Sequence, residues 1–269
     1  MQYNSPLRLT PLEGRLLAWA QMREVRCADS ERIRTELRLS PKVSRELLDK
    51  MNRRGLLVQL QRGLYLIPDK LPPGGTWQPS AEVAIFYFLS YKKARWQETG
   101  PGVFQYHGLS EQLANQSFVY NNKVSATRKF GQLEVQFIKV PSSRLGKFVE
   151  IHLKGEPLAL RRIASLPRAV FDAIYDYNRF GSMSRVLTWI ENRHSDPGFI
   201  KELIDCAIEH GNVASRRRIG WILSSCGVGK QSLRALQTSL GPTRSYIPMD
   251  PGKPSRGRIN KEWGVLDNV

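Results

Sequence analysis

Polar and basic side chains gather at the start of one predicted helix, where they could read the base edges of DNA. Four of them, Ser40, Lys42, Ser44 and Arg45, lie at the front of the segment SPKVSRELLDKMNRR, residues 40–54. In a major groove Lys and Arg donate to guanine edges, and hydroxyl groups can pair with either base. We therefore expect these four residues to bind DNA from the exposed first turn of a recognition helix.

The same segment has the local signals of a helix with one buried face. Ser40 can cap the helix by accepting a hydrogen bond from a free backbone amide, and Gly55 can end it in a left-handed conformation. Apolar residues at helical spacing predict the inward face, and they are Val43, Leu47, Leu48 and Met51. Ser44 and Arg45 are then expected to point outward.

Two earlier helices and a hairpin flank this segment in the sequence. Thr10 and Glu13 form a predicted capping box for a first helix, and Asp29 or Ser30 can cap a second. The stretch GLLVQLQRGLYLIP alternates and turns at a glycine, which predicts a two-stranded wing with Arg62 at its tip, placed to hold the DNA backbone or minor groove. Residues 1–70 are thus predicted to form a winged helix-turn-helix domain. A small three-helix domain with solvated arginines would share these features.

The length and charge of the chain require more than this one domain. The chain has 269 residues, a formal net charge of +17 and a pI near 10.1. Such a charge favours a polyanionic partner, and we expect double-stranded DNA rather than an acidic membrane surface. The Pro- and Gly-rich residues 71–79 predict a linker to a second domain, residues 80–269. Because no apolar run of membrane-spanning length and no signal peptide occur, the protein is predicted to be cytoplasmic, with no membrane partner.

The second domain is expected to be mixed α/β to about residue 155 and mainly helical after it. Strand-like alternation occurs at 118–120 and 133–138, and helical patterns recur from Pro157 onward. The overall fold class is therefore α+β. One helical pattern begins with Arg216, Arg217 and Arg218, which we interpret as a possible second basic surface for phosphates or an acidic partner. A solvated helix face is the alternative.

The sequence gives little sign of catalysis. Cys27, Cys206 and Cys226 lie far apart, and Cys206 belongs to an apolar helical series typical of a buried residue. The segment GVGKQS lacks the spacing of a phosphate loop, and the strand segment EVQ at Glu134 lacks the lysine expected in metal-dependent nucleases. We therefore expect no catalytic residue, no metal and no cofactor, and the protein is predicted not to be an enzyme.

Several segments occur in a fixed order along the chain: GLLVQLQRGLYLIP, YHGLSEQ before FVYNNKV, VQFIKV, SLPRAVFDAI, RRRIGWIL and YIPMDPGKPSRGRINKEWGVLDNV. In this order they resemble the AbiEi-type antitoxins of abortive-infection systems. The resemblance covers nearly the whole chain through short motifs. It implies an N-terminal winged helix that represses its own promoter by binding inverted repeats. It also implies a C-terminal domain that counters a neighbouring nucleotidyltransferase-like toxin in a type IV arrangement, without a stable complex.

Two other classes of function remain open at this point. A nucleic-acid-processing enzyme, with the winged helix as a targeting module, would depend on a divalent metal or yield a cleavage product. An RNA-binding protein would bind unstructured RNA more tightly than promoter DNA.

The free protein is predicted to be a monomer, with two copies meeting only on the inverted repeats of DNA. The sequence has no heptad seam, and Leu9, Leu12 and Leu16 are needed by the core around the first helix, so no helix is left over for a dimer. Light scattering without DNA tests this prediction. A stable dimer at micromolar concentration would contradict it and would assign the two-fold symmetry to the C-terminal domain.

Overall fold

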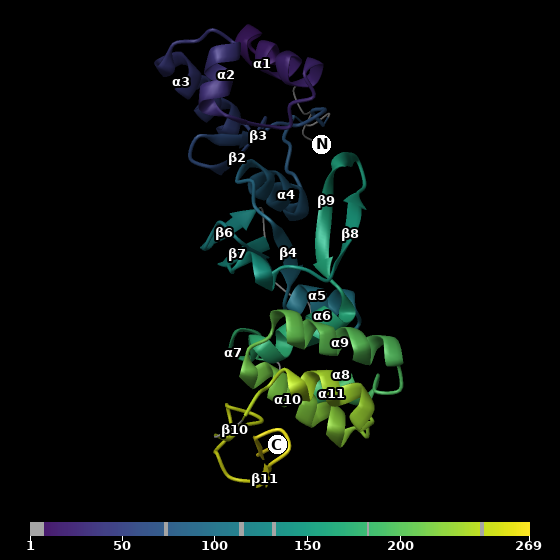
Figure 1. Ribbon diagram of the computed structural model, residues 1–269. Helices are drawn as coiled ribbons and strands as arrows, with labels where there is room; N and C mark the ends of the chain where they lie inside the picture. The colour runs from purple at the N-terminus through teal and green to yellow at the C-terminus, as the bar shows by residue number, and fades with distance from the viewer. Residues whose placement is uncertain (1–7, 73–74, 113–115, 131–132, 182, 243–244) are drawn as a thin grey trace. The chain divides into compact units, whose positions relative to one another are not determined.

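A computed structural model describes residues 8–72, 75–112, 116–130, 133–181, 183–242 and 245–269, which divide into two compact units (Figure 1). Unit 1 comprises the described residues of Met1–Ala94, Lys129–Leu133 and His152–Leu160. Unit 2 comprises those of Arg95–Arg128, Glu134–Ile151 and Arg161–Val269. The fold is mixed, with helices and sheets in one chain, as the α+β prediction requires at this level.

Unit 1 begins with three helices and a small antiparallel sheet of order β1-β3-β2. The predicted caps are present: Thr10 forms the capping box with Glu13, Asp29 accepts from the amide of Arg32, and Ser40 accepts from that of Val43. The elements are α1 (Pro11–Met22), β1 (Cys27–Asp29), α2 (Ser30–Glu36), α3 (Pro41–Arg53), β2 (Val58–Gln61), β3 (Leu64–Leu66) and α4 (Ala81–Tyr91).

The sheet of unit 1 differs from the two-stranded wing predicted from the sequence. A third strand, β1, pairs antiparallel with β3, so that Cys27 lies opposite Leu66 and Asp29 opposite Leu64. Three residues are too few to show an alternating pattern, which is why the sequence gave no sign of this strand. The apolar residues beneath the sheet and helices include Leu16, Ile33, Leu48, Met51 and Leu56, each nearly inaccessible to solvent.

The predicted linker and domain boundary also differ from the structure. Helix α4, which is capped by Ser80, groups with unit 1. Within 71–79, residues 73–74 lie outside the described part of the chain, but the following residues pack on unit 1. The amide of Trp77 donates to the carbonyl of Gly55 at 2.8 Å, and a methyl at Gly55 would meet Thr76 Cγ2 at 2.7 Å. The described residues of this connection between β3 and α4 are therefore packed, and they do not form a free joint.

A six-stranded sheet of order β6-β7-β5-β4-β9-β8 occupies the middle of the chain. Strand β4 pairs antiparallel with β5 and parallel with β9, and β5 pairs parallel with β7. Its elements, with the intervening short helices, are β4 (Trp96–Thr99), α5 (Pro101–Tyr106), β5 (Gln116–Asn121), β6 (Ala126–Phe130), β7 (Leu133–Lys139), η1 (Ser142–Arg144), β8 (Phe148–Leu153) and β9 (Glu156–Ala164).

Strand β9 overturns the expectation that helix dominates from Pro157 onward. Gly155, with a left-handed φ of +75°, turns the chain after β8, and the next nine residues run as a strand beside β4. The helix expected in this region starts only at Leu166, where the hydroxyl of Ser165 caps it by accepting from the amide of Arg168. The neighbouring strand β4 is distant in sequence, and its pairing with β9 outweighs the local helix preference of residues 156–164.

After β9 the chain is mainly helical, as predicted, and these helices form the core of unit 2 with a small terminal sheet of order β10-β12-β11 (Figure 1). Trp263 is buried against Gly220, where a Cβ atom would meet the indole ring at 2.1 Å. The elements are α6 (Leu166–Tyr175), α7 (Tyr177–Phe180), α8 (Met183–Glu191), α9 (Pro197–His210), α10 (Val213–Ser225), α11 (Lys230–Thr238), β10 (Ile247–Pro248), β11 (Arg258–Asn260) and β12 (Val265–Asp267).

Candidate nucleic-acid interface

The first turn of α3 presents part of the predicted recognition surface. The side chains of Lys42 and Arg45 are exposed, as expected. Ser40 is exposed as well, but its hydroxyl already accepts from the amide of Val43 at 3.3 Å. Ser40 therefore holds the start of the helix, and the two cations carry its outward charge.

Ser44 corrects the predicted orientation of α3. Its side chain is only 3% exposed, whereas Val43, which was assigned to the inward stripe, is 39% exposed. The buried residues of α3 are Ser44, Leu47, Leu48 and Met51, an i, i+3, i+4, i+7 series. Ser44 thus faces the domain interior rather than solvent, and its hydroxyl makes no hydrogen bond within the described residues.

A groove of about 630 Å³ lies between α2 and α3 on one side and the β2–β3 hairpin on the other. It brings together three of the five predicted DNA-binding residues, Ser44, Arg45 and Arg62, and excludes Ser40 and Lys42 from its lining. Arg34, Gln59 and Tyr65 also line the groove, and the sequence analysis missed them. The outward position of Gln59 on a short alternating strand was the one signal that could have found it.

Charges in this groove are unevenly paired. Arg34 donates from Nε to Glu31 at 3.1 Å, and this hydrogen bond lowers the pKa of the Glu31 carboxyl. Burial raises the pKa of Tyr65, and the charge of Asp49 raises it further. Among the described residues, Arg45 and Arg62 take part in no ion pair. Their guanidinium groups therefore keep their donors for an external acceptor such as a phosphate oxygen.

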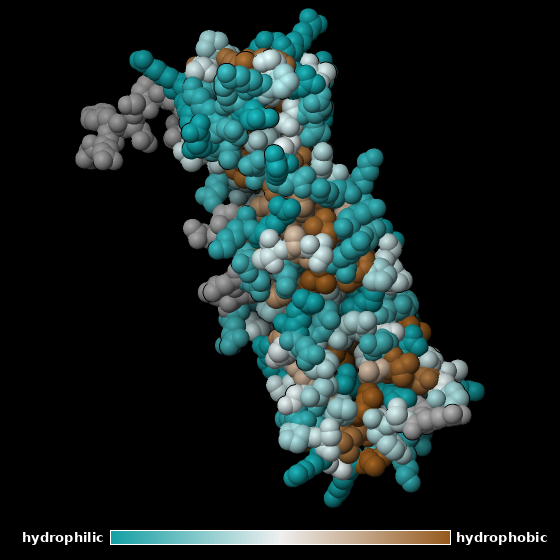
Figure 2. Space-filling view, turned by 90° about the vertical axis from the view of Figure 1, so that its left-hand side faces the viewer, coloured by the Kyte–Doolittle hydropathy of each residue, from teal (hydrophilic) through white to brown (hydrophobic). Residues whose placement is uncertain are grey.

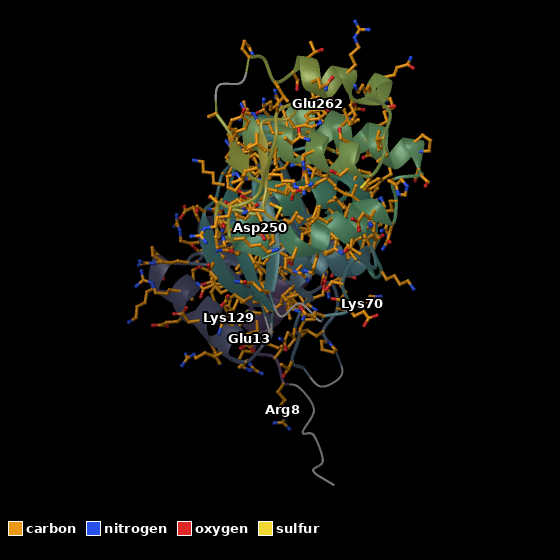
Figure 3. All side chains as sticks on the ribbon, turned by 90° about the horizontal axis from the view of Figure 1, so that it is seen from below. Arg8, Glu13, Lys70, Lys129, Asp250 and Glu262 are labelled. Atoms are coloured by element: carbon orange, nitrogen blue, oxygen red, sulfur yellow. The ribbon has the colours of Figure 1, made fainter. Side chains whose placement is uncertain are left out.

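A buried carboxylate fixes α3 against α1 at the far end of the helix. Glu13, at 0% exposure, accepts from Arg54 Nη1 at 2.6 Å through each of its oxygens. Arg54 also donates to the carbonyl of Arg8 at 2.8 Å. Arg8 and Glu13 are labelled in Figure 3. Burial raises the pKa of Glu13, but hydrogen bonds from Thr10 and Arg54 outweigh it and hold that pKa below its usual value.

The three arginines predicted as a second basic surface are not such a surface. Arg217 and Arg218 are 6% and 7% exposed, and Arg216 is half-buried. Arg216 donates to the carbonyls of Ala207 and Ile208 in the last turn of α9, and the Ala207 carbonyl also accepts from the amide of Gly211. The arginines therefore have a structural role in unit 2, because they donate hydrogen bonds to backbone carbonyls.

Arg218 likewise donates hydrogen bonds to backbone carbonyls, here at the terminal sheet. Its Nε donates to the carbonyl of Met249 at 3.1 Å and its Nη2 to that of Pro248 at 3.2 Å, while the guanidinium lies 5.2 Å from the centre of the Tyr177 ring. Burial lowers the pKa of this guanidinium, although Tyr177 and Asp250 act in the opposite direction. The side chain joins α10 to the strand β10 and the residue that follows it.

Other sequence signals have structural explanations in the described residues. Cys206 is buried as predicted, and burial raises the pKa of its thiol to about 12; the Cys27 thiol is raised to about 12 in the same way. His107 Nε2 lies 2.8 Å from the carbonyl of Ala164, which is a structural contact. GVGKQS follows a helix, not a strand, so its context is not that of a phosphate loop.

Within the described residues, no group of three or more His, Cys, Asp and Glu side chains could hold a metal ion. In the same part of the chain no helix combines the length and apolar character needed to cross a membrane. Hydrophilic residues cover most of the face drawn in Figure 2, and hydrophobic ones form smaller patches among them.

Comparison with known proteins gives a match in structure but not in sequence. No family model and no curated protein matches the chain. The fold is similar to that in the crystal structure of the RV2827C protein from Mycobacterium tuberculosis, with a TM-score of 0.63 and 12% sequence identity. The match covers 99% of this chain and 94% of that one. At this identity the likeness concerns the fold alone.

Replacing Arg218 by alanine is expected to destabilise unit 2. The change leaves two backbone carbonyls without their donor, and an unsatisfied buried acceptor costs about 1–3 kcal/mol. The matched control is Lys253→Ala, which removes an exposed cation from the same region and should stay within about 0.5 kcal/mol of the parent. Urea unfolding followed by circular dichroism measures both. Equal midpoints for the two variants would contradict the structural role of Arg218.

Proposed function

We propose that unit 1 is a winged helix-turn-helix that binds double-stranded DNA, with α3 in the major groove and the β2–β3 hairpin as the wing. The observation that carries the proposal is the pair of unpaired, exposed arginines, Arg45 and Arg62, on the two sides of one groove. One arginine comes from the helix and one from the hairpin tip, which is the placement that a base-reading helix and a backbone-contacting wing need.

The roles within this interface follow from exposure. Lys42 and Arg45 read base edges, because their side chains lie free on the first turn of α3. Arg62 holds the backbone or minor groove from the wing. Ser40 contributes to DNA recognition indirectly, as the cap of α3, and Ser44 is buried and makes no contact with DNA in this proposal.

The wider proposal is that the protein is an autorepressor and antitoxin of the AbiEi type. It binds inverted repeats in its own promoter and counters a neighbouring nucleotidyltransferase-like toxin without a stable complex. The ordered motifs of the sequence support this, together with the separate second unit and the net charge of +17. Arg216, Arg217 and Arg218 are no longer part of the proposal as a protective surface, because they bind carbonyls of their own unit.

The double variant Lys42→Ala with Arg45→Ala is expected to lose selective binding to the protein's upstream DNA while keeping its fold. Each lost base contact should cost about 1–3 kcal/mol. Arg62→Ala should weaken specific and random DNA alike and lower the salt slope by about one. Fluorescence anisotropy with promoter and scrambled duplexes measures this, and Arg15→Ala, an exposed cation on α1, is the control. A double variant that footprints the promoter like the parent would refute the recognition assignment.

Repression and protection are expected to separate in the full-length chain. Cells that express the neighbouring toxin should survive with the Lys42→Ala, Arg45→Ala variant, since protection is assigned to unit 2, yet a promoter-reporter fusion should be derepressed. The full chain is the right reagent, because α4 and two later segments group with unit 1. If this variant fails to protect cells from the toxin at parental protein levels, the assignment of protection to unit 2 is wrong.

A further inference from the structure

Unit 1 contains a second concave site, built from residues other than those of the groove beside α3. It is a cavity of about 320 Å³ formed by the turn after α1, the start of α2, the end of α4 and Leu158 of β9. Glu24, in this turn, adopts a left-handed φ of +52°, and the chain then enters β1. Cavities of this size are at the small end of those that hold small molecules.

Arg26 is the most buried cation of this cavity. Its side chain is 10% exposed, and its Nε and Nη2 atoms both bind the carboxylate of Glu156. The guanidinium carbon also lies 5.9 Å from the centre of the Trp77 ring. Its remaining nitrogen, Nη1, is buried and makes no hydrogen bond within the described residues. The side chain is therefore held rigidly by two partners while one of its donors has no acceptor.

Tyr87 supplies a second buried donor at the same place. Its hydroxyl is also buried and has no hydrogen-bond partner among the described residues. Burial raises the pKa of this phenol, Glu156 raises it further, and the nearby Arg26 guanidinium lowers it. The two groups are therefore neighbours, but the contact is not a well-formed hydrogen bond. Leaving a buried polar group unsatisfied costs about 1–3 kcal/mol, so both groups call for an acceptor.

The rim of the cavity adds further cations. Arg23 and Arg32 are exposed and line it, and Tyr91, which is 43% exposed, lines it as well. The adjacent acid Asp29 is already engaged, because it caps α2 and accepts from the Tyr91 hydroxyl at 3.3 Å. Glu24 is the acidic residue among those lining the cavity, and it is exposed at the edge, where solvent screens it.

We propose that this cavity binds the terminal phosphate of a small phosphate monoester. Arg26 Nη1 and the Tyr87 hydroxyl donate to phosphate oxygens at its floor, and Arg23 and Arg32 neutralise the remaining charge at its rim. A terminal phosphate fits because it only accepts hydrogen bonds and has three free oxygens to share among these donors. A nucleic-acid backbone phosphate fits these donors less well, because it is esterified on two sides and has only two free oxygens to share among them.

The test is titration of the full-length protein with inorganic phosphate and with AMP, at ionic strength matched by chloride. Isothermal titration calorimetry and thermal shift should both detect saturable binding. Tyr87→Phe should weaken it about tenfold, as expected when a hydrogen bond to a charged group is lost. Because the lost hydroxyl has no partner, the unliganded Tyr87→Phe variant should melt at or above the parental temperature, which separates lost binding from lost folding.

The second arm changes the rim. The Arg23→Gln, Arg32→Gln double variant should bind phosphate more weakly than the parent, whereas Arg15→Gln, which removes an exposed arginine elsewhere in unit 1, should not. Absence of saturable binding at millimolar phosphate and AMP would overturn the proposal and leave an ordered water as the acceptor. Equal binding by Tyr87→Phe, or Tyr87-dependent binding of a short DNA duplex in place of AMP, would overturn it as well. The Lys42→Ala, Arg45→Ala variant should bind AMP normally, so failure here is distinct from failure of DNA recognition.

Discussion

Unit 2 depends on an ion pair that has no contact with water. Arg168 and Asp172 are both 0% exposed, and Nε of the arginine lies 2.9 Å from Oδ1 of the aspartate. Thr99 of β4 donates to the other carboxylate oxygen at 2.8 Å, and Arg168 donates to the carbonyls of Arg144 and Gly146. The pair therefore joins the sheet, the η1 turn and α6 at one point. Loss of one partner from such a buried pair costs about 3–5 kcal/mol, because it strands the other charge.

The sequence predicted helix in this region, but it predicted neither the start of α6 at Leu166 nor this role of the buried pair. Ser165 caps the helix by a bond to a residue three positions on, and such local contacts are visible in a sequence. Arg168 and Asp172, at i and i+4, have the spacing of an ordinary solvent-exposed helix pair. Their burial is decided by Thr99 and by the carbonyls after η1, which lie far away in the chain. Strand β9 escaped prediction for a related reason, since it lies beside the distant strand β4 as well as beside β8, whereas β1 is too short to show an alternating pattern.

The apolar pattern of α3 is compatible with two orientations of its first turn. The inward face of α3 contains Leu47, Leu48 and Met51. Either Val43 or Ser44 could extend this face by one turn, because each lies four residues before one of the two leucines. Hydrophobicity favours Val43, yet the structure buries Ser44 and exposes Val43. The neighbouring elements decide which of the two residues is buried, since Ser44 lies on the side of α3 that lines one groove with α2 and the hairpin. The cap, both helix ends and the exposed cations were predictable, whereas this rotation of the first turn was not.

The net charge of +17 contains two kinds of arginine that act at different ranges. Arg216 and Arg218 donate to neutral carbonyls of their own unit, and their positive charge is not cancelled. They still contribute to the long-range field that draws a polyanion toward the protein. In the DNA complex proposed above, Arg45 and Arg62, with unpaired groups at the surface, would also displace counterions. For that proposed complex, the salt dependence of the association rate should report the charge of the whole chain, and the salt dependence of the binding constant should report only the exposed cations that touch DNA.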